Sequence, residues 1–198
     1  MSEFGIRNYH PGDLPALYRI CLETGADGED ATGSIDPEIL GHLFAGPYAV
    51  LEPELCFILT ADGAPCGYIL GTADSIVFEQ RARKEWFPLL KQRYSLPDPA
   101  DTSREAGLIR SIHAGYRAPS YSQSYPAHLH IDLLPEGQGQ GHGTRLIHLY
   151  LDQLRTLDVS ALHLGVSKGN QRAIAFYPRV GFSIIKESAD SLVYGMRL

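Results

Sequence analysis

The stretch that decides the fold is AHLHIDLLPEGQGQGHGT, residues 127–144. Apolar and polar side chains alternate over residues 127–134, which predicts a strand. Residues 135–140 hold proline and glycine and predict a tight turn. A helix is expected over about 141–157, because one face of it would be apolar: Leu146, Ile147, Tyr150, Leu151 and Leu154.

The glycines between this strand and this helix fall at alternate positions, Gly139, Gly141 and Gly143. Such spacing lets the backbone turn sharply, so that several N–H groups point into one concavity. The helix that follows adds the positive end of its dipole, and together they favour a phosphate group. A flexible glycine-rich surface turn is the alternative interpretation.

Two common phosphate-binding motifs do not match this loop. A Walker loop requires Gly-Lys-Ser/Thr, which is absent at the required spacing. A dinucleotide fingerprint requires G-x-G-x-x-G and an acidic residue about 20 positions later. Here the glycines read G-x-G-x-G, and the next expected strand, residues 161–166, contains no acid. We therefore do not expect a dinucleotide.

The rest of the chain predicts alternating helices and strands. Strands are expected at 4–7, 55–60, 66–72, 182–186 and 191–197, and helices at 14–24, 37–44, 76–94, 103–112 and 170–177. We expect Asp13 to cap the first helix and Pro88 to break the segment 76–94. The pattern predicts one domain over residues 1–198, with a mixed α/β sheet and a helical and loop insert at about 76–126.

Composition limits the classes of function. The chain has 198 residues, of which 44% are hydrophobic and 20% charged, with a net charge of −6. These values exclude a disordered chain and a coiled coil, and an acidic chain is a poor nucleic-acid binder. No apolar run is long enough to span a membrane, and no signal peptide is visible at the start. With three scattered cysteines, Cys21, Cys56 and Cys66, we expect reduced thiols and a cytoplasmic location.

Two motifs carry a family resemblance. Gln138-x-x-Gly141-x-Gly143 resembles the Q/R-x-x-G-x-G/A pyrophosphate loop of the GCN5-related N-acetyltransferases (GNAT). Asn170-x-x-Ala173-x-x-Phe176-Tyr177-x-x-x-Gly181-Phe182 resembles a later motif of that family. The resemblance covers residues 127–182. It implies a mostly antiparallel central sheet flanked by helices, the acyl-CoA N-acyltransferase fold, with acetyl-CoA as co-substrate and no metal.

A narrower resemblance covers more of the chain. Residues 6–11 (IRNYHP), 18–21 (YRIC), 56–59 (CFIL) and 66–74 (CGYILGTAD) are similar to the acetyltransferase-like C-terminal domain of animal O-GlcNAcase. That domain has a degraded cofactor loop, whereas the full pattern from Gln138 to Gly143 is present here. The difference favours acetyl-CoA binding by this chain.

The resemblance also implies roles for particular residues. Main-chain N–H groups of the loop would hold the pyrophosphate, from Gln138, Gly139, Gln140, Gly141, His142, Gly143 and Thr144. Main-chain groups of Ile131 and Leu133 would pair with the pantetheine arm, which Asn170 would also contact. Tyr177 matches a family tyrosine that protonates the departing thiolate, and a phenol is still protonated at neutral pH.

The general base is less defined by the sequence. His128, His130 and Asp132 alternate along one expected strand, so their side chains share one face. They could ligate a metal, take a proton through water, or be buried and hydrogen-bonded. Family members with a glutamate base place it where this chain has Ala127, and His113 is a further candidate. Attack by an amine that solvent deprotonates also remains open. We take Asp132 and Tyr177 as the candidate catalytic residues.

The acceptor would bind in the part of the chain outside the motifs. The tyrosine-rich loop 115–126 and the helical segment 76–112 could cover the acceptor cleft, or the tyrosines could cover the core. We expect acetyl transfer to the amine of a small molecule. A catalytically inactive acetyl-CoA-binding domain and a protein lysine or histone acetyltransferase are the alternatives, and the sequence leaves the oligomeric state open.

Overall fold

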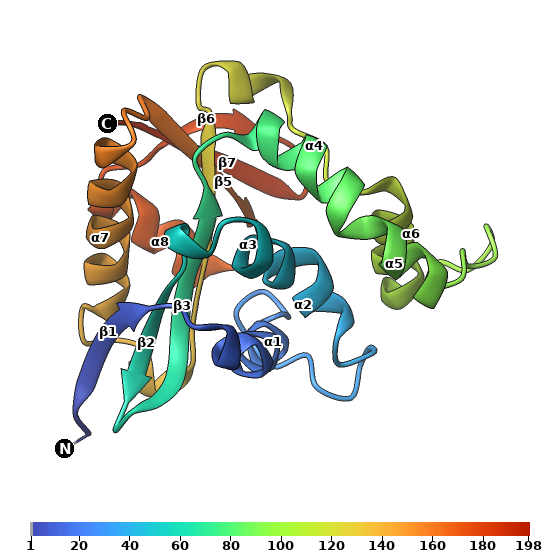
Figure 1. Cartoon of the computed structure of the whole chain (residues 1–198), viewed down its shortest axis with the longest axis horizontal. Coiled ribbons are helices and arrows are strands. Elements are labelled where there is room, and N and C mark those ends of the chain that lie inside the picture. The colour runs from blue at the N-terminus through green and yellow to red at the C-terminus, as the bar shows by residue number, and fades with distance from the viewer. Residues whose placement is uncertain (1) are drawn as a thin grey trace.

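The computed structural model describes residues 2–198, and its centre is a seven-stranded sheet in the order β1-β2-β3-β4-β5-β7-β6 (Figure 1). β4 and β5 run parallel, and the other neighbouring pairs are antiparallel. The predicted mixed, mostly antiparallel sheet is confirmed. The strands are β1 (Phe4–Asn8), β2 (Phe57–Ala61), β3 (Ala64–Thr72), β4 (Ala127–Leu133), β5 (Ala161–Ser167), β6 (Ser183–Glu187) and β7 (Ser191–Arg197).

Helices cover both faces of this sheet. α7 lies on one face, α1 to α3 lie on the other, and α4 to α6 extend away from the sheet (Figure 1). Within residues 2–198, no helix has the length and hydropathy that crossing a bilayer requires. The helices are α1 (Leu14–Glu23), α2 (Ile39–Phe44), α3 (Gly46–Leu51), α4 (Ser75–Glu85), α5 (Phe87–Arg93), α6 (Arg104–Ala114), α7 (His142–Thr156) and α8 (Gln171–Phe176).

Three details differ from the sequence prediction. The break in segment 76–94 falls at Trp86, with Pro88 in the first turn of α5, where a proline needs no hydrogen-bond partner. Asp13 precedes α1 but does not cap it with its side chain, because its carboxylate accepts from the Arg7 guanidinium at 2.7 Å. The short helix α3 was not predicted at all.

β4 and β5 separate soon after they begin. Their register covers Ala127 opposite Leu162 and His128 opposite His163, and no further pair follows. On its other edge β4 stays paired with β3 from His128 to Leu133. The two parallel strands therefore form an open V, and one edge of β4 is left without a strand partner beyond its second residue.

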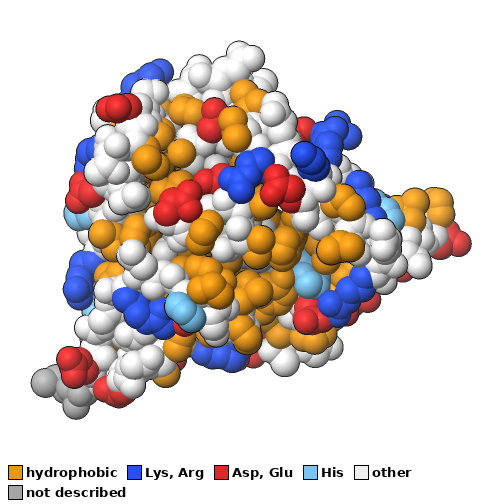
Figure 2. Space-filling view, viewed as in Figure 1, with side chains coloured by type: hydrophobic (Ala, Val, Ile, Leu, Met, Phe, Trp, Pro, Cys, Tyr) orange, Lys and Arg blue, Asp and Glu red, His pale blue; other side chains and the backbone are white. Residues whose placement is uncertain are grey.

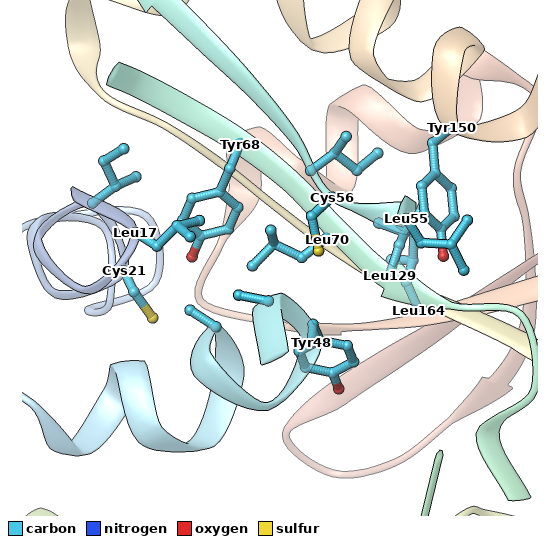
Figure 3. Packing of buried hydrophobic residues seen from close by; sticks show 14 of the residues in the cluster. Leu17, Cys21, Tyr48, Leu55, Cys56, Tyr68, Leu70, Leu129, Tyr150 and Leu164 are labelled. Carbon is cyan, nitrogen blue, oxygen red and sulfur yellow. The ribbon is translucent and has the colours of Figure 1, made fainter. Parts of the chain in front are cut away.

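The core closes on both faces of the sheet around β3. Figure 3 shows Tyr150 of α7 and Tyr48 of α3 among the buried residues around Leu70. The Tyr150 hydroxyl donates to the main-chain oxygen of His128 at 3.0 Å. It lies directly over Gly71, where an added Cβ would be 2.1 Å from that hydroxyl oxygen and 2.3 Å from the His128 oxygen. Gly71 is thus required by close packing.

We expect Gly71→Ala to destabilise the fold by about 2–3 kcal/mol or more, because a rigid main-chain oxygen blocks the new methyl group. Chemical denaturation measures this. Gly107→Ala is the matched control: Gly107 lies inside α6 with nothing within 4 Å of an added Cβ, and alanine should stabilise a helix there by up to about 1 kcal/mol. Equal stability of the two variants would contradict the packing argument.

Candidate active site

The V between β4 and β5 holds a cavity of about 210 Å³, called here the β4–β5 cavity. β5 contributes residues 164–167 to its wall, and β4 contributes residues 129–132. Asn170 and Tyr177 close it from the segment after β5. One cavity is therefore lined by four residues to which the sequence analysis assigned separate roles: Ile131, Asp132, Asn170 and Tyr177.

The free edge of β4 faces this cavity. The Leu134 N–H donates to the Cys66 oxygen on the β3 side, at 2.8 Å. Since successive residues of a strand point their peptide groups to opposite sides, Ile131 and Leu133 point theirs toward β5. The Leu133 oxygen is already occupied, because the side-chain amide of Gln138 donates to it at 2.6 Å. The main chain of Ile131 and the N–H of Leu133 are left to pair with an extended ligand.

The loop after β4 presents main-chain groups at the start of α7. Gly139 and Gly141 have φ values of 76° and 81°, a left-handed conformation that favours glycine. Gly141 is the N-cap of α7, and no side chain caps the helix. The first N–H groups of α7 therefore have no partner within the helix and are available to an anion. Residues 138–144 line neither of the two cavities described here.

The side chain of His142 is buried and is not placed to contact a ligand. It packs on Phe4 of β1 with 4.4 Å between the ring centroids. Both of its ring nitrogens are buried and have no partner within residues 2–198. Any contact of His142 with a phosphate must therefore come from its main-chain N–H.

Asn170 and Tyr177 lie at the two ends of α8. The Asn170 side-chain oxygen accepts from the Ala173 N–H at 2.9 Å and so caps the helix. Tyr177 is buried, and burial is the main cause that raises the pKa of its phenol; the carboxylate of Asp132 also raises it. Among residues 2–198, the fully buried side-chain nitrogen and oxygen atoms without a hydrogen bond belong to Ser122 and His142. The Tyr177 hydroxyl is not among them, although it has no hydrogen-bond partner in the described chain, so it is not completely buried. A ligand in the cavity that Tyr177 lines can therefore reach it.

A second cavity of about 320 Å³, called here the α1–α6 cavity, lies on the helical side of β4. Its wall is largely apolar, with Leu40, Phe44 and Leu108, and Arg104 of α6 is also part of it. Sequence reasoning did not identify these residues as one site, since they come from two elements, α2 and α6, that lie about 60 residues apart in the chain. Both cavities share two lining residues, His130 and Asp132, so the cavities meet at this point of β4.

Asp132 is held by the neighbouring strand. In the β3–β4 register it lies opposite Tyr68, whose hydroxyl donates to its Oδ2 at 2.6 Å. Burial raises the pKa of the Asp132 carboxyl, while the Tyr68 hydrogen bond opposes that rise by stabilising the charged form. A carboxyl whose pKa is raised toward neutrality is suited to accept a proton from an amine.

The two histidines of β4 join a network that depends on Tyr48, a residue that the sequence analysis missed. The Tyr48 hydroxyl lies 2.8 Å from Nε2 of His128 and 3.1 Å from Nε2 of His130. Nδ1 of His128 lies 2.7 Å from the Ser75 hydroxyl. Within residues 2–198, no group of three or more His, Cys, Asp or Glu side chains is placed to hold a metal ion.

Other candidates lie away from the junction of the cavities. Nε2 of His113 is 2.7 Å from the main-chain oxygen of Tyr94. In the tyrosine-rich loop 115–126, Tyr116 stacks on His128 and Tyr121 packs edge-on against His163. These tyrosines line neither cavity, so α6 and not that loop forms the wall of the α1–α6 cavity.

The surface carries charges of both signs. On the face seen in Figure 2, acidic and basic side chains are interspersed with apolar ones.

Comparison with known proteins identifies the family. The model of the acetyltransferase (GNAT) family matches residues 30–182. The chain belongs to the GNAT acetyltransferase family. A crystal structure of a protein named SsHAT is 37% identical, with a TM-score of 0.93 and 98% of each chain covered.

A structure of lower identity shares the fold, and two curated proteins are similar in sequence. YncA of Salmonella typhimurium, described as a putative acetyltransferase and solved with acetyl-CoA, is 13% identical with a TM-score of 0.58, covering 98% of this chain and 94% of that one. The O-GlcNAcases of Rattus norvegicus and Mus musculus are each 24% identical over 187 residues, 92% of this chain. The chain spans about one fifth of the length of these two curated relatives.

Proposed function

We propose that the protein is an acetyl-CoA-dependent N-acetyltransferase acting on a primary amine of a small molecule. One observation carries the proposal: two cavities, one beside a free strand edge and one with an apolar wall, meet at His130 and Asp132. A group-transfer enzyme needs two substrates side by side. This arrangement supplies a space for each.

The residues present fit acetyl-CoA. The open edge of β4 at Ile131 can pair with an extended amide-containing arm as an added strand would. The uncapped start of α7, with Gly139 and Gly141 in left-handed conformations, can hold a diphosphate by its N–H groups. The bound thioester supplies an activated acetyl group. Three buried free cysteines fit the reducing cytoplasm, which we propose as the location.

Asp132 and Tyr177 complete the proton balance. The amine nitrogen forms a bond to the thioester carbonyl carbon and gives up a proton to Asp132, while the C–S bond breaks. Tyr177 donates its hydroxyl proton to the departing thiolate. A proton passing from Asp132 to Tyr177 then restores both residues, so amine and thioester become amide and thiol. The raised pKa of the Tyr177 phenol keeps its proton in place until the thiolate forms.

The size of the α1–α6 cavity supports a small acceptor. Its volume of about 320 Å³ is at the lower end of the range of roughly 300–1,000 Å³ for small-molecule sites. Arg104, Leu108 and Phe44 bound it with side chains from α6 and α2. A pocket of this size suits a compact amine better than an extended peptide.

Calorimetric titration with coenzyme A tests the first half of the proposal. Wild type should bind, and Gly141→Ala should bind roughly tenfold more weakly, since a left-handed alanine costs about 1–2 kcal/mol. Gly63→Ala is the matched control, because Gly63 has a φ of 83° in the β2–β3 turn and no atom within 4 Å of an added Cβ. It should lose similar stability and keep its affinity. No binding by wild type would overturn the proposal.

Release of free thiol over a panel of amines tests the second half. Tyr177→Phe should lower kcat by roughly 10²-fold, as expected for loss of a general acid, and leave acetyl-CoA affinity nearly intact. Tyr194→Phe is the control, because Tyr194 is buried beside Tyr177 at 5.5 Å between ring centroids and lies outside both cavities. An unchanged kcat in Tyr177→Phe would remove this residue from the mechanism. Faster acetylation of a histone-tail peptide than of small amines would overturn the acceptor class.

The pH dependence of kcat/KM tests Asp132. The carboxylate of Asp132 is protonated, and its base form is lost, as the pH falls through its raised pKa. The fall of kcat/KM on the acidic side of the profile should therefore occur at a higher pH than the ordinary aspartate pKa of about 4. Tyr68→Phe removes a hydrogen bond to the charged form and should move that limb to higher pH. Tyr150→Phe, another fully buried tyrosine whose hydroxyl donates to main-chain oxygens, should leave it in place. An unmoved limb in Tyr68→Phe would point to a different base.

A further inference from the structure

The buried hydrogen bonds around β4 determine which ring nitrogens carry protons. They start from Ser75 at the beginning of α4, whose hydroxyl is 2.6 Å from the main-chain oxygen of Pro126. A carbonyl oxygen can only accept, so the single hydroxyl proton of Ser75 goes to Pro126. The Ser75 oxygen is also 2.7 Å from Nδ1 of His128. Nδ1 of His128 must therefore be the donor in that contact. The Tyr116 hydroxyl lies 3.3 Å from the same nitrogen and, toward a protonated Nδ1, can only accept.

The same reasoning assigns the proton on the ring of His130, through the contacts of Tyr48. Burial lowers the pKa of His128 well below its usual value, so the ring is neutral and its Nε2 has no proton. The Tyr48 hydroxyl must then donate to Nε2 of His128. Its oxygen is left to accept, and the partner is Nε2 of His130 at 3.1 Å. His130 therefore carries its proton on Nε2.

The other nitrogen of His130 is consequently a bare acceptor. Burial lowers the pKa of His130 to about 4, with a further contribution from His163, so the ring is neutral at physiological pH. No protein group among residues 2–198 hydrogen-bonds to Nδ1. Nδ1 is also not completely buried: the fully buried side-chain atoms without a hydrogen bond among residues 2–198 belong to Ser122 and His142. It is thus accessible to a ligand at the junction of the two cavities that His130 lines.

We propose that Nδ1 of His130, together with the carboxylate of Asp132, binds the nitrogen of the acceptor and selects a primary amine. This inference rests on the proposed function and names the residue that recognises the acceptor. Both groups only accept hydrogen bonds in these states, and an amine or ammonium group is rich in N–H donors. A carboxylate in the same place would meet two acceptors and be rejected. Phe44, 5.7 Å from the His130 ring between centroids, supplies an apolar wall for the body of the amine.

The tautomers can be measured directly in the 198-residue chain. Nitrogen-15 NMR of the imidazole rings distinguishes a protonated ring nitrogen from a bare one, and His130→Gln assigns the His130 signals among the eight histidines. We expect a bare Nδ1 in His130 and a bare Nε2 in His128. A proton on Nδ1 of His130 would overturn the proposal, whatever the enzyme's activity.

Ligand selectivity is tested in the same spectra. n-Butylamine and phenethylamine should displace the Nδ1 signal of His130. Butyltrimethylammonium, which has the same charge and no N–H group, and butyrate should not. Absence of a displacement with both amines, or an equal one with butyltrimethylammonium, would overturn the proposal. Displacement without any thiol release would support this amine site while contradicting the proposed catalysis.

Two variants separate amine binding from a structural role of His130. His130→Asn places a side-chain oxygen near the position of Nδ1, whereas His130→Gln keeps a donor toward Tyr48 near the position of Nε2. We expect the KM for phenethylamine to rise at least tenfold in the glutamine variant and only a few-fold in the asparagine variant. Coenzyme A affinity should stay unchanged in both. The reverse order would show that the contact with Tyr48, and not an exposed Nδ1, is what matters.

Discussion

The separation of β4 from β5 after two paired residues is the constraint from which the rest of the site follows. A parallel pair that continued would have satisfied the peptide groups of Ile131 and filled the space between the strands. Because the strands part, a free edge and a cavity arise together, and the cavity is reached by both α8 and β4. The pairing of β4 with β3 along its other edge keeps the free edge rigid. The free peptide groups of this edge can hydrogen-bond to water, or to a ligand that takes the place of the missing strand.

The alternation of residues along β4 gives each of the two cavities its own set of groups. Main-chain groups of the odd-numbered residues face β5, while the side chains of His130 and Asp132 lie where the two cavities meet. A shift of the β3–β4 register by one residue would exchange these roles, since it would turn the acceptor side chains to the opposite face. Gly71 opposite Leu129 and Tyr68 opposite Asp132 hold that register, the first by close packing under Tyr150 and the second by a hydrogen bond.

Local features were predictable from the sequence, and long-range ones were not. The loop from Gln138 to Thr144 and the flanking strand and helix follow from glycine spacing and from hydrophobic periodicity, which act over neighbouring residues. Tyr48 is different: it lies in a six-residue helix that begins with Gly46 and Pro47, and its partner His128 is 80 residues away. Nothing in local composition indicates that contact. The wall of the α1–α6 cavity formed by Arg104 and Leu108 depends on the same kind of long-range packing.

The histidine network is better explained as a device for orientation than as a proton wire. The 2.6 Å contact of Ser75 leads to the main-chain oxygen of Pro126, which cannot donate a proton, and the other contact of Nδ1 of His128, to the Tyr116 hydroxyl, is longer at 3.3 Å. Each hydrogen bond instead determines where the next proton lies. The Pro126 oxygen determines the direction of the Ser75 hydroxyl, and Ser75 determines the tautomer of His128. The Tyr48 hydroxyl then determines the tautomer of His130. Burial lowers the pKa of both rings, so neither becomes a cation that would repel an ammonium group. The base that we propose is Asp132, because burial raises the pKa of its carboxyl, the direction that a base requires.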